Sequence, residues 1–337
     1  MDKLPLVSVC IPVYNGEKFI EKTLTTIVNQ DYQNIEIIVL DNASADSTAM
    51  IVKKFDDPRI KYFKNDNTIK AGDNWTRAVG LARGDFVAIY HADDIYEKNI
   101  VSKEVEFLLN NPKVGVVFSE AKKINSVDKE IGAIKVPKNL PAIITFRDLF
   151  LQLLRNNYNP LVCPTAMVRK EIYQKTLPYD NANYKYVFDI EMYLRIAEIS
   201  DVGIIKEPLI NYRIHQNQGS LKYLNEQVDH NEFYDMIDRF IAKNDTTLTN
   251  SDLDRYDAFK RWDYAVHAIK ALTVGNRQKA KELSSKILSL KMIRTCLFYP
   301  PLLLRLFIIF CFLLSLTLGF GESFAKIYTK NKMNPFG

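Results

Sequence analysis

The feature that most constrains this fold is an alternation of short β-rich runs and amphipathic helical stretches over the first 120 residues. The β-rich runs, dominated by Val and Ile, predict strands at residues 6–12, 35–40, 60–63, 85–90 and 114–118. The intervening stretches predict helices at 17–29, 44–55 (with Ser44 as N-cap), 71–82 and 97–110. Strands separated by helices of this length form βαβ units, so the pattern predicts an α/β fold with a Rossmann-like, mainly parallel sheet flanked by helices.

Polar side chains follow three of these strands, as Tyr14-Asn15, Asp41-Asn42 and Asp93-Asp94. Ligands of open α/β sheets bind beyond the carboxyl ends of the strands, so the three loops predict one shared binding rim. Adjacent carboxylates repel unless a cation or hydrogen-bond donors compensate them. Asp93-Asp94 is therefore a candidate Mg²⁺ or Mn²⁺ site that holds a diphosphate. The alternative is an ordinary acidic turn that caps the helix near Glu97.

Several single residues allow both a chemical and a structural interpretation. Tyr14 is either a stacking surface for a base or a packing residue, and Asp41 either binds a base or ribose or caps a helix. Asp189 begins a predicted helix over 189–199, where a carboxylate is either a cap or a general base that deprotonates an acceptor hydroxyl. His215, in a loop beside Arg213, is either a metal or phosphate ligand or a surface histidine.

The rest of the chain and its composition narrow the class of protein. A helix at 146–155, a loop at 156–164 and a strand at 165–168 precede a helical region at 222–290, where Gly275-Asn276 predicts a helical hairpin. A net charge of +5 without a Lys/Arg cluster argues against nucleic-acid binding. The four cysteines are isolated, which favours a reducing compartment, and no signal peptide is recognised at the start. We expect the first part of the chain to lie in the cytoplasm.

The segment 302–320 is almost entirely apolar, with Arg305 as its only charge. As a helix it would be roughly 28 Å long, close to the ~30 Å hydrocarbon thickness of a bilayer. It is either a buried helix, a transmembrane span or a helix that lies in the membrane interface, with Arg305 reaching the headgroups. Basic residues flank it on both sides: Lys286, Lys291 and Arg294 before, and Lys326, Lys330 and Lys332 after. The segment predicts membrane attachment.

Taken in order, several motifs resemble the nucleotide-sugar-binding half of the family 2 glycosyltransferases, which adopt the GT-A fold. They are VSVCIPVYNGEKFI at 7–20, NQDY at 29–32, IEIIVLDNASADST at 35–48, ARGDFV at 82–87 and HADD at 91–94. Later matches are FDIEMYLR at 188–195 and YRIHQNQGS at 212–220. The chain departs from the family at His91, where the acidic signature often begins with Asp. It also departs at Phe188, where a Glu usually precedes the catalytic Asp, and at 73–77, which replaces a more frequent R-N-x-G.

The resemblance implies a role for each matching residue. Pro12, Tyr14, Asn15 and Glu17 would line the nucleotide pocket, and Asp41 would hold the base or ribose. Asp93 would contact the donor. Asp93, Asp94 and His215 would hold a divalent ion, Mn²⁺ or Mg²⁺. Arg213 would neutralise the charge of the leaving group. Asp189 would be the catalytic base.

The resemblance also implies an inverting transfer from a nucleotide-sugar to a saccharide or a polyprenyl-diphosphate-linked glycan, as in O-antigen or capsule synthesis at the cytoplasmic face of the inner membrane. The corresponding divisions are a catalytic domain at 1–220 (donor half 1–120, acceptor half 121–220), a helical extension at 221–298 and a membrane-associating tail at 299–337. A sugar nucleotidyltransferase is less compatible, since the first strand is not followed by a Gly-rich phosphate loop. A non-catalytic membrane-associated scaffold is the alternative of a different class.

Overall fold

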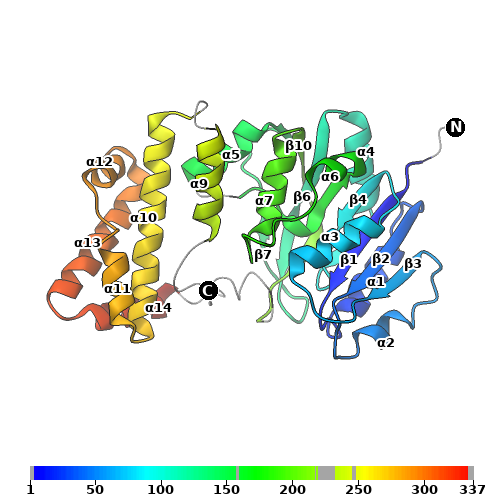
Figure 1. Cartoon of the computed structure of the whole chain (residues 1–337), viewed down its shortest axis with the longest axis horizontal. Coiled ribbons are helices and arrows are strands. Elements are labelled where there is room, and N and C mark those ends of the chain that lie inside the picture. The colour runs from blue at the N-terminus through cyan, green and yellow to red at the C-terminus, as the bar shows by residue number, and fades with distance from the viewer. Residues whose placement is uncertain (1–3, 157–158, 217, 219–231, 245–247, 333–337) are drawn as a thin grey trace. The chain divides into compact units, whose positions relative to one another are not determined.

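The structure, a computed structural model, describes residues 4–156, 159–216, 218, 232–244 and 248–332 (Figure 1). The chain forms two compact units. The sheet unit comprises Met1–Phe150 and Pro160–Gln218, and the helical unit comprises Leu151–Asn159 and Gly219–Gly337. The functional divisions expected at residues 220 and 298 stay predictions.

Within the described residues, the sheet unit contains one ten-stranded sheet with the order β3-β2-β1-β4-β9-β6-β10-β5, to which β7 and β8 add at β6 and β10. The strands are β1 Val7–Val13, β2 Ile35–Asp41, β3 Ile60–Lys64, β4 Phe86–Ile89, β5 Ile95–Tyr96, β6 Val114–Ile124, β7 Glu130–Ile134, β8 Ile143–Ile144, β9 Ala166–Arg169 and β10 Asp201–Arg213. The block β3-β2-β1-β4 is parallel throughout, and β6 is parallel to β10. Strand β9 runs antiparallel between β4 and β6. The predicted α/β fold with a mainly parallel sheet is confirmed.

Helices cover the two faces of this sheet. The helices of the sheet unit are α1 Ile20–Val28, α2 Thr48–Val52, α3 Ala71–Leu81, α4 Ile100–Asn110, α6 Lys170–Thr176 and α7 Phe188–Ala197. Helix α5 Phe146–Asn156 belongs to this unit up to Phe150 and to the helical unit beyond it. Val9 and Ile11 of β1 share a buried cluster with residues of α1 and α4. Cys10 points to the opposite face, where its thiol donates to the Ala78 carbonyl of α3. Burial on both faces explains why β1 and β2 are continuous apolar runs.

Three details differ from the sequence predictions. Ser44 does not cap a helix, because its Oγ accepts a hydrogen bond from the Asn15 backbone N–H, and α2 begins only at Thr48. Helix α4 begins at Ile100 and not at 97, because Ile95 and Tyr96 pair with β10 as strand β5. The sequence analysis did not predict β10, the 13-residue strand that leads to the predicted site residues at 213 and 215.

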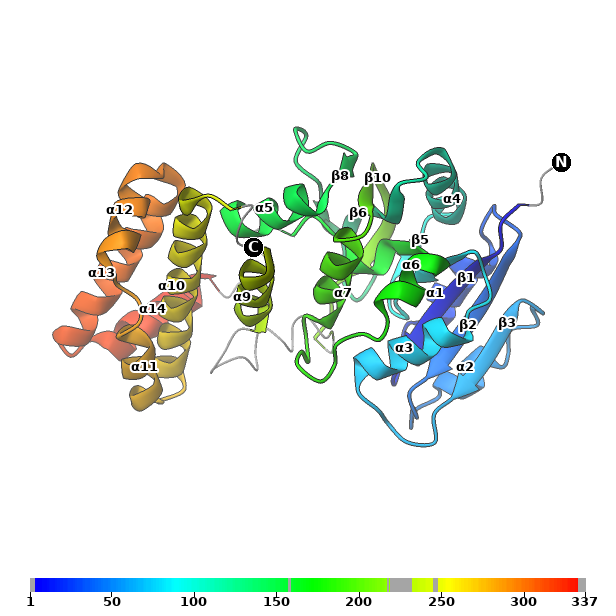
Figure 2. The same ribbon diagram turned by 45° about the horizontal axis from the view of Figure 1, so that its top comes forward.

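The helical unit contains α9 Glu232–Asn244, α10 Asn250–Thr273, α11 Arg277–Ser284, α12 Leu290–Phe298, α13 Leu303–Thr317 and α14 Gly321–Lys332 (Figure 2). Gly275 has a φ of +77°, which glycine adopts without strain, and it ends α10 before α11, so the predicted hairpin is confirmed. The part of the predicted helical region at 222–231 lies outside the described residues. Arg305 does not extend away from the unit, because its guanidinium lies over the rings of Phe259 and Trp262 of α10.

The ARGD segment fits closely against the first two strands. The backbone N–H of Gly84 donates to Ser8 Oγ (2.8 Å), and that of Arg83 donates to Glu36 Oε1 (2.7 Å). A Cβ at Gly84 would lie 2.6 Å from the Leu6 carbonyl oxygen and 2.7 Å from the Ser8 nitrogen. Both atoms belong to the backbone, which cannot move as a flexible side chain can. Only glycine fits at this position.

We therefore expect Gly84→Ala to lower the free energy of unfolding by about 1–3 kcal/mol, the usual cost of overpacking. Gly80→Ala is the matched control, because a Cβ at Gly80 in α3 meets nothing within 4 Å. That control should raise stability by up to about 1 kcal/mol, since alanine favours helices over glycine. Thermal and urea unfolding measure both, and a Gly84→Ala protein as stable as the wild type would contradict this account.

Candidate functional site

The ends of β1 and β2 are fastened to each other by side chains predicted to bind the donor. Asn15, at a φ of +50°, accepts a hydrogen bond from the Ala45 N–H through its Oδ1 (3.0 Å). Glu17 Oε2 accepts from the Ser47 N–H (2.9 Å). Tyr14, which precedes Asn15, is 57% exposed, and Pro12 in β1 is partly buried. Asn15 and Glu17 therefore shape the loop that presents the Tyr14 ring.

Asp41 is fully buried at the end of β2. Its Oδ1 accepts from the Ser44 N–H (2.7 Å), and its Oδ2 accepts from the Tyr62 hydroxyl (2.5 Å). One oxygen thus stabilises the turn after β2, and the other holds a side chain of the neighbouring strand β3. The expected contact of Asp41 with a base or ribose stays a prediction.

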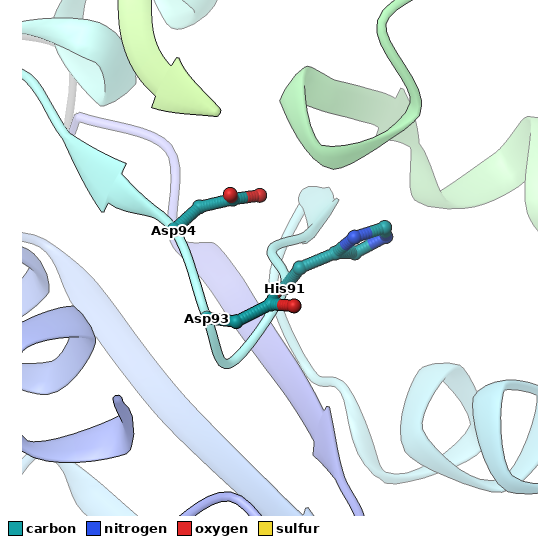
Figure 3. A group of neighbouring side chains, drawn as sticks. All are labelled: His91, Asp93 and Asp94. Carbon is teal, nitrogen blue, oxygen red and sulfur yellow. The ribbon is translucent and has the colours of Figure 1, made fainter. Parts of the chain in front are cut away.

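The acidic turn follows β4 and carries His91, Asp93 and Asp94 (Figure 3). One ligand atom from each of these three side chains lies within 4.8 Å of the others. Asp94 is buried, and its Oδ2 has no hydrogen-bond partner in the part of the chain that the structure describes. Burial, together with the neighbouring Asp93 carboxylate, raises the pKa of Asp94 well above its usual value. A buried oxygen without a donor beside a second carboxylate and an imidazole fits a divalent cation.

The end of β10 holds this turn in place. The Arg213 N–H donates to Asp94 Oδ1 (2.7 Å), and Arg213 Nε donates to the Asp93 carbonyl (2.7 Å). The Arg213 guanidinium also lies 4.5 Å from the centre of the Phe19 ring and pairs with Asp128. Arg213 is 1% exposed, so its contacts assign it to positioning the turn. The expected direct contact with a leaving diphosphate stays a prediction.

His215 lies directly behind Asp93, with 2.9 Å between His215 Nε2 and Asp93 Oδ2. Burial opposes ionisation of Asp93, but the contacts with His215 and the nearby His91 ring lower its pKa overall. The structure thus brings Asp93 and Asp94 together, with His215 in contact with Asp93 only. It adds His91 to the group, a residue that the sequence analysis noted only as a departure from the family.

Asp189 is in the first turn of α7. The N-cap residue of α7 is Val187, and Asp189 Oδ1 accepts a hydrogen bond from the Ile190 N–H of the first turn (2.8 Å). Its carboxylate hydrogen-bonds the Cys163 thiol, and burial raises the pKa of Asp189. The Cys163 sulfur is in turn 3.8 Å from His91 Nε2. Asp189 and the acidic turn are therefore linked through one thiol and one imidazole.

Sequence reasoning missed four side chains of this site: Phe19, Trp75, Asp128 and Cys163. The Trp75 ring lies 5.4 Å from the His91 ring and 5.2 Å from the Phe188 ring, between the acidic turn and α7. Asp128 pairs with both Arg213 and Lys22. Cys163 is isolated in the sequence, and only the antiparallel pairing of β9 with β4 brings it to the site. Trp75 had one available signal, since the chain has only 2 tryptophans.

Comparison with known proteins identifies the family. Residues 8–177, which are 170 of the 337 residues, match the profile described as Glycosyl transferase family 2. The chain belongs to this family.

Relatives of this family 2 glycosyltransferase occur in distant organisms. A glycosyltransferase of Haemophilus influenzae is 30% identical over 233 residues, 67% of this chain and 71% of the relative. One from Methanocaldococcus jannaschii is 31% identical over 232 residues, 67% of this chain and 77% of the relative.

Solved structures of S. aureus TarS share the fold. TarS is 18% identical with a TM-score of 0.54, covering 84% of this chain and 50% of TarS. TarS 1-349 in complex with UDP-GlcNAc is 16% identical with a TM-score of 0.50, covering 82% of this chain and 89% of that one. The glycosyltransferase fold predicted for the chain is confirmed by these likenesses.

The burial of Asp94 predicts that its carboxylate lowers the stability of the metal-free protein, although the same carboxylate is expected to bind the metal ion. Its pKa is higher in the folded protein than in the unfolded chain, so its ionisation opposes folding as the pH rises above about 4. Asp94→Asn should therefore raise the Tm without metal, by roughly 2–4 °C for each kcal/mol relieved. It should also lose the stabilisation that Mn²⁺ gives to the wild type.

Differential scanning calorimetry with and without Mn²⁺ measures both effects. Asp66→Asn, at an exposed turn residue, is the control and should change neither value. A lower Tm for Asp94→Asn, with an unchanged Mn²⁺ response, is the result that contradicts the role given to Asp94.

Proposed function

We propose that this family 2 glycosyltransferase transfers a sugar, with inversion, from a nucleotide-diphosphate donor to a saccharide or lipid-linked glycan acceptor. The observation that carries the proposal is the pairing of two groups within one unit. The first is an acidic turn with a buried carboxylate oxygen that has no hydrogen-bond partner among the described residues. The second is the partly buried carboxylate of Asp189, which is connected to that turn through Cys163 and His91. The first suits a charged donor, and the second suits an acceptor hydroxyl.

The donor pocket is proposed along the ends of β1, β2 and β4. Tyr14 offers an exposed ring for the base, and Pro12, Asn15, Glu17 and Asp41 define the loops around it. The similarly folded TarS binds UDP-GlcNAc, which supports a nucleotide-sugar as the donor class. Asp93 would contact the donor at the far end of this pocket.

The acidic turn is proposed to hold Mn²⁺ or Mg²⁺ through Asp93 and Asp94, with His215 beside them. When bound, such an ion supplies positive charge that stabilises a leaving diphosphate. The protein prepares this position by holding two carboxylates together in a turn where Asp94 is buried and Asp93 is partly buried. Arg213 fixes the backbone of that turn and places a second positive charge next to it.

Asp189 is proposed as the general base. A carboxylate whose pKa is raised by burial lies closer to the operating pH, and this makes proton transfer from a hydroxyl more efficient. The deprotonated hydroxyl attacks the anomeric carbon from the face opposite the diphosphate. No covalent sugar–enzyme intermediate is needed, so the configuration inverts.

The helical unit is proposed to attach the enzyme to the cytoplasmic face of the inner membrane. Among the described residues, one segment, Pro300–Thr317, is long and apolar enough to span a bilayer, with a mean hydropathy of 2.1. Leu306, Ile309 and Phe312 of α13 are buried in a cluster shared with α10, whereas the opposite side exposes Leu304, Phe307 and Leu314. Because one side is already packed, we propose that α13 lies in the membrane interface and does not span it.

The charges around α13 support a lipid surface as its partner. No acidic residue occurs between Glu282 and Glu322, and exposed Arg294, Lys326 and Lys330 flank the helix on the two sides. Basic residues beside an apolar helix face favour anionic lipids. A membrane location suits a polyprenyl-diphosphate-linked acceptor, and thus synthesis of a surface polysaccharide such as O-antigen or capsule, with residues 1–120 binding the donor and 121–220 the acceptor.

Asp189→Asn tests the catalytic assignment. The amide keeps the shape of the side chain but accepts no proton, so transfer should fall at least 100-fold, the lower limit for general base catalysis. Donor binding is followed by the thermal shift with UDP-, GDP- and dTDP-sugars plus Mn²⁺. The Kd for the donor that these shifts report should change less than threefold. The control is Glu171→Gln, at an exposed acidic residue in the first turn of α6. Near-normal transfer by Asp189→Asn would remove Asp189 from the mechanism.

Phe307→Gln combined with Leu314→Gln tests the membrane proposal. These side chains are 65% and 59% exposed, so the change should leave folding intact and reduce co-sedimentation with phosphatidylglycerol vesicles at least tenfold. Val274→Gln, at a residue 69% exposed in the hairpin turn, is the control. Wild-type vesicle binding by the double variant, or resistance of the native protein to carbonate extraction, would count against an interfacial helix.

A further inference from the structure

The acidic turn begins with His91, and a ring nitrogen of this histidine lies close to an oxygen of each of the two carboxylates. We infer that His91 is itself a ligand of the metal ion, so that the site has one nitrogen and two carboxylate groups and selects Mn²⁺ over Mg²⁺. This inference rests on the proposed function of the turn as a metal site. It adds a ligand that the sequence comparison did not supply.

The geometry of the turn carries the inference. One ring nitrogen of His91 and one oxygen each of Asp93 and Asp94 lie within 4.8 Å of one another. In an octahedral site with bonds of ~2.1 Å, two ligand atoms are about 3 Å apart when adjacent and about 4.2 Å apart when opposite. Small side-chain rotations therefore bring the three atoms to bonding distance. Asp94 Oδ2 has no hydrogen-bond partner among the described residues, and this is an independent sign that a ligand belongs here.

The surroundings of His91 restrict the orientation of its ring. The His91 N–H donates to the Tyr96 hydroxyl (2.7 Å), which fixes the backbone. The ring lies between the Trp75 ring (5.4 Å between centres) and the Cys163 sulfur, 3.8 Å from Nε2. Such outer contacts fix the orientation of a ligating imidazole.

His215 has a different position. Its Nε2 is 2.9 Å from Asp93 Oδ2, so in this structure it contacts the carboxylate and not the space between the three ligand atoms. A partner behind a ligating carboxylate orients that carboxylate. His91 and His215 thus provide a matched pair of histidines, one within the ligand group and one behind it.

The ligand type determines which ion is favoured. Carboxylate oxygens suit Mg²⁺ and Mn²⁺ alike, whereas imidazole nitrogen favours the later transition ions and is a poor ligand for Mg²⁺. Replacing the carboxylate that often begins this motif with an imidazole should therefore weaken Mg²⁺ more than Mn²⁺. The competing interpretation is that His91 only packs between Trp75 and Cys163.

The test measures metal binding to the full chain without donor. Calorimetric titration gives the Kd for Mn²⁺ and for Mg²⁺, and electron spin echo modulation of bound Mn²⁺ detects a directly bonded ¹⁴N. The variants are His91→Asp, His91→Ala and, as the matched control, His215→Asn. Circular dichroism and the Tm establish whether each variant is folded. If one of the two His91 variants does not fold, the other still tests the inference.

We expect His91→Ala to weaken Mn²⁺ about tenfold or more, and both substitutions at His91 to lose the ¹⁴N modulation. His91→Asp should lower the preference for Mn²⁺ over Mg²⁺ at least tenfold, and His215→Asn should keep the modulation. Unchanged modulation in the His91 variants overturns the inference and leaves the proposed function standing. No Mn²⁺ binding by the wild-type chain overturns the inference and the metal dependence of the proposed function together.

Discussion

The arrangement of the site depends on the contact between the end of β10 and the turn after β4. Arg213 joins them with a backbone N–H on the Asp94 carboxylate and a side-chain Nε on the Asp93 carbonyl. These two hydrogen bonds join residues that lie 119 and 120 positions apart in the chain. Without a positive charge there, the buried Asp94 carboxylate and its partly buried neighbour Asp93 would repel each other at a considerable cost in free energy. The same arginine meets Phe19 and Asp128, so α1 and the turn after β6 depend on it as well.

The sequence predicted the sheet and its binding rim because both follow from local pattern. A run such as residues 35–40 has the length and composition of a buried strand, and polar residues after parallel strands lie at one edge of the sheet. The positions of helix starts were less predictable, since Ser44 can accept a hydrogen bond from a helix or from a distant backbone N–H. The structure shows the second, because Asn15 lies opposite it.

The remainder of the site could not be predicted, because it depends on pairings between distant segments. The proximity of Cys163 to His91 follows from β9 lying beside β4, and the burial of Arg213 follows from β10 lying beside β6. Neither pairing has a signal at short range. The motif resemblance supplied part of this missing information, because it connected Asp93, Asp189 and His215 as members of one site. The family motifs have no residue that corresponds to Trp75 or to a histidine at position 91.

The antiparallel direction of β9 has a consequence for how such a site can diversify. The parallel strands reach the rim with their carboxyl ends, whereas β9 reaches it with its beginning, where Ala166 pairs with Ile89. The peptide that ends at Thr165 therefore reaches the rim at the amino end of a strand. Insertions or deletions in that peptide leave the register of β1, β2 and β4 untouched. The peptide before β9 can thus vary in length during evolution while the parallel strands keep their arrangement at the rim.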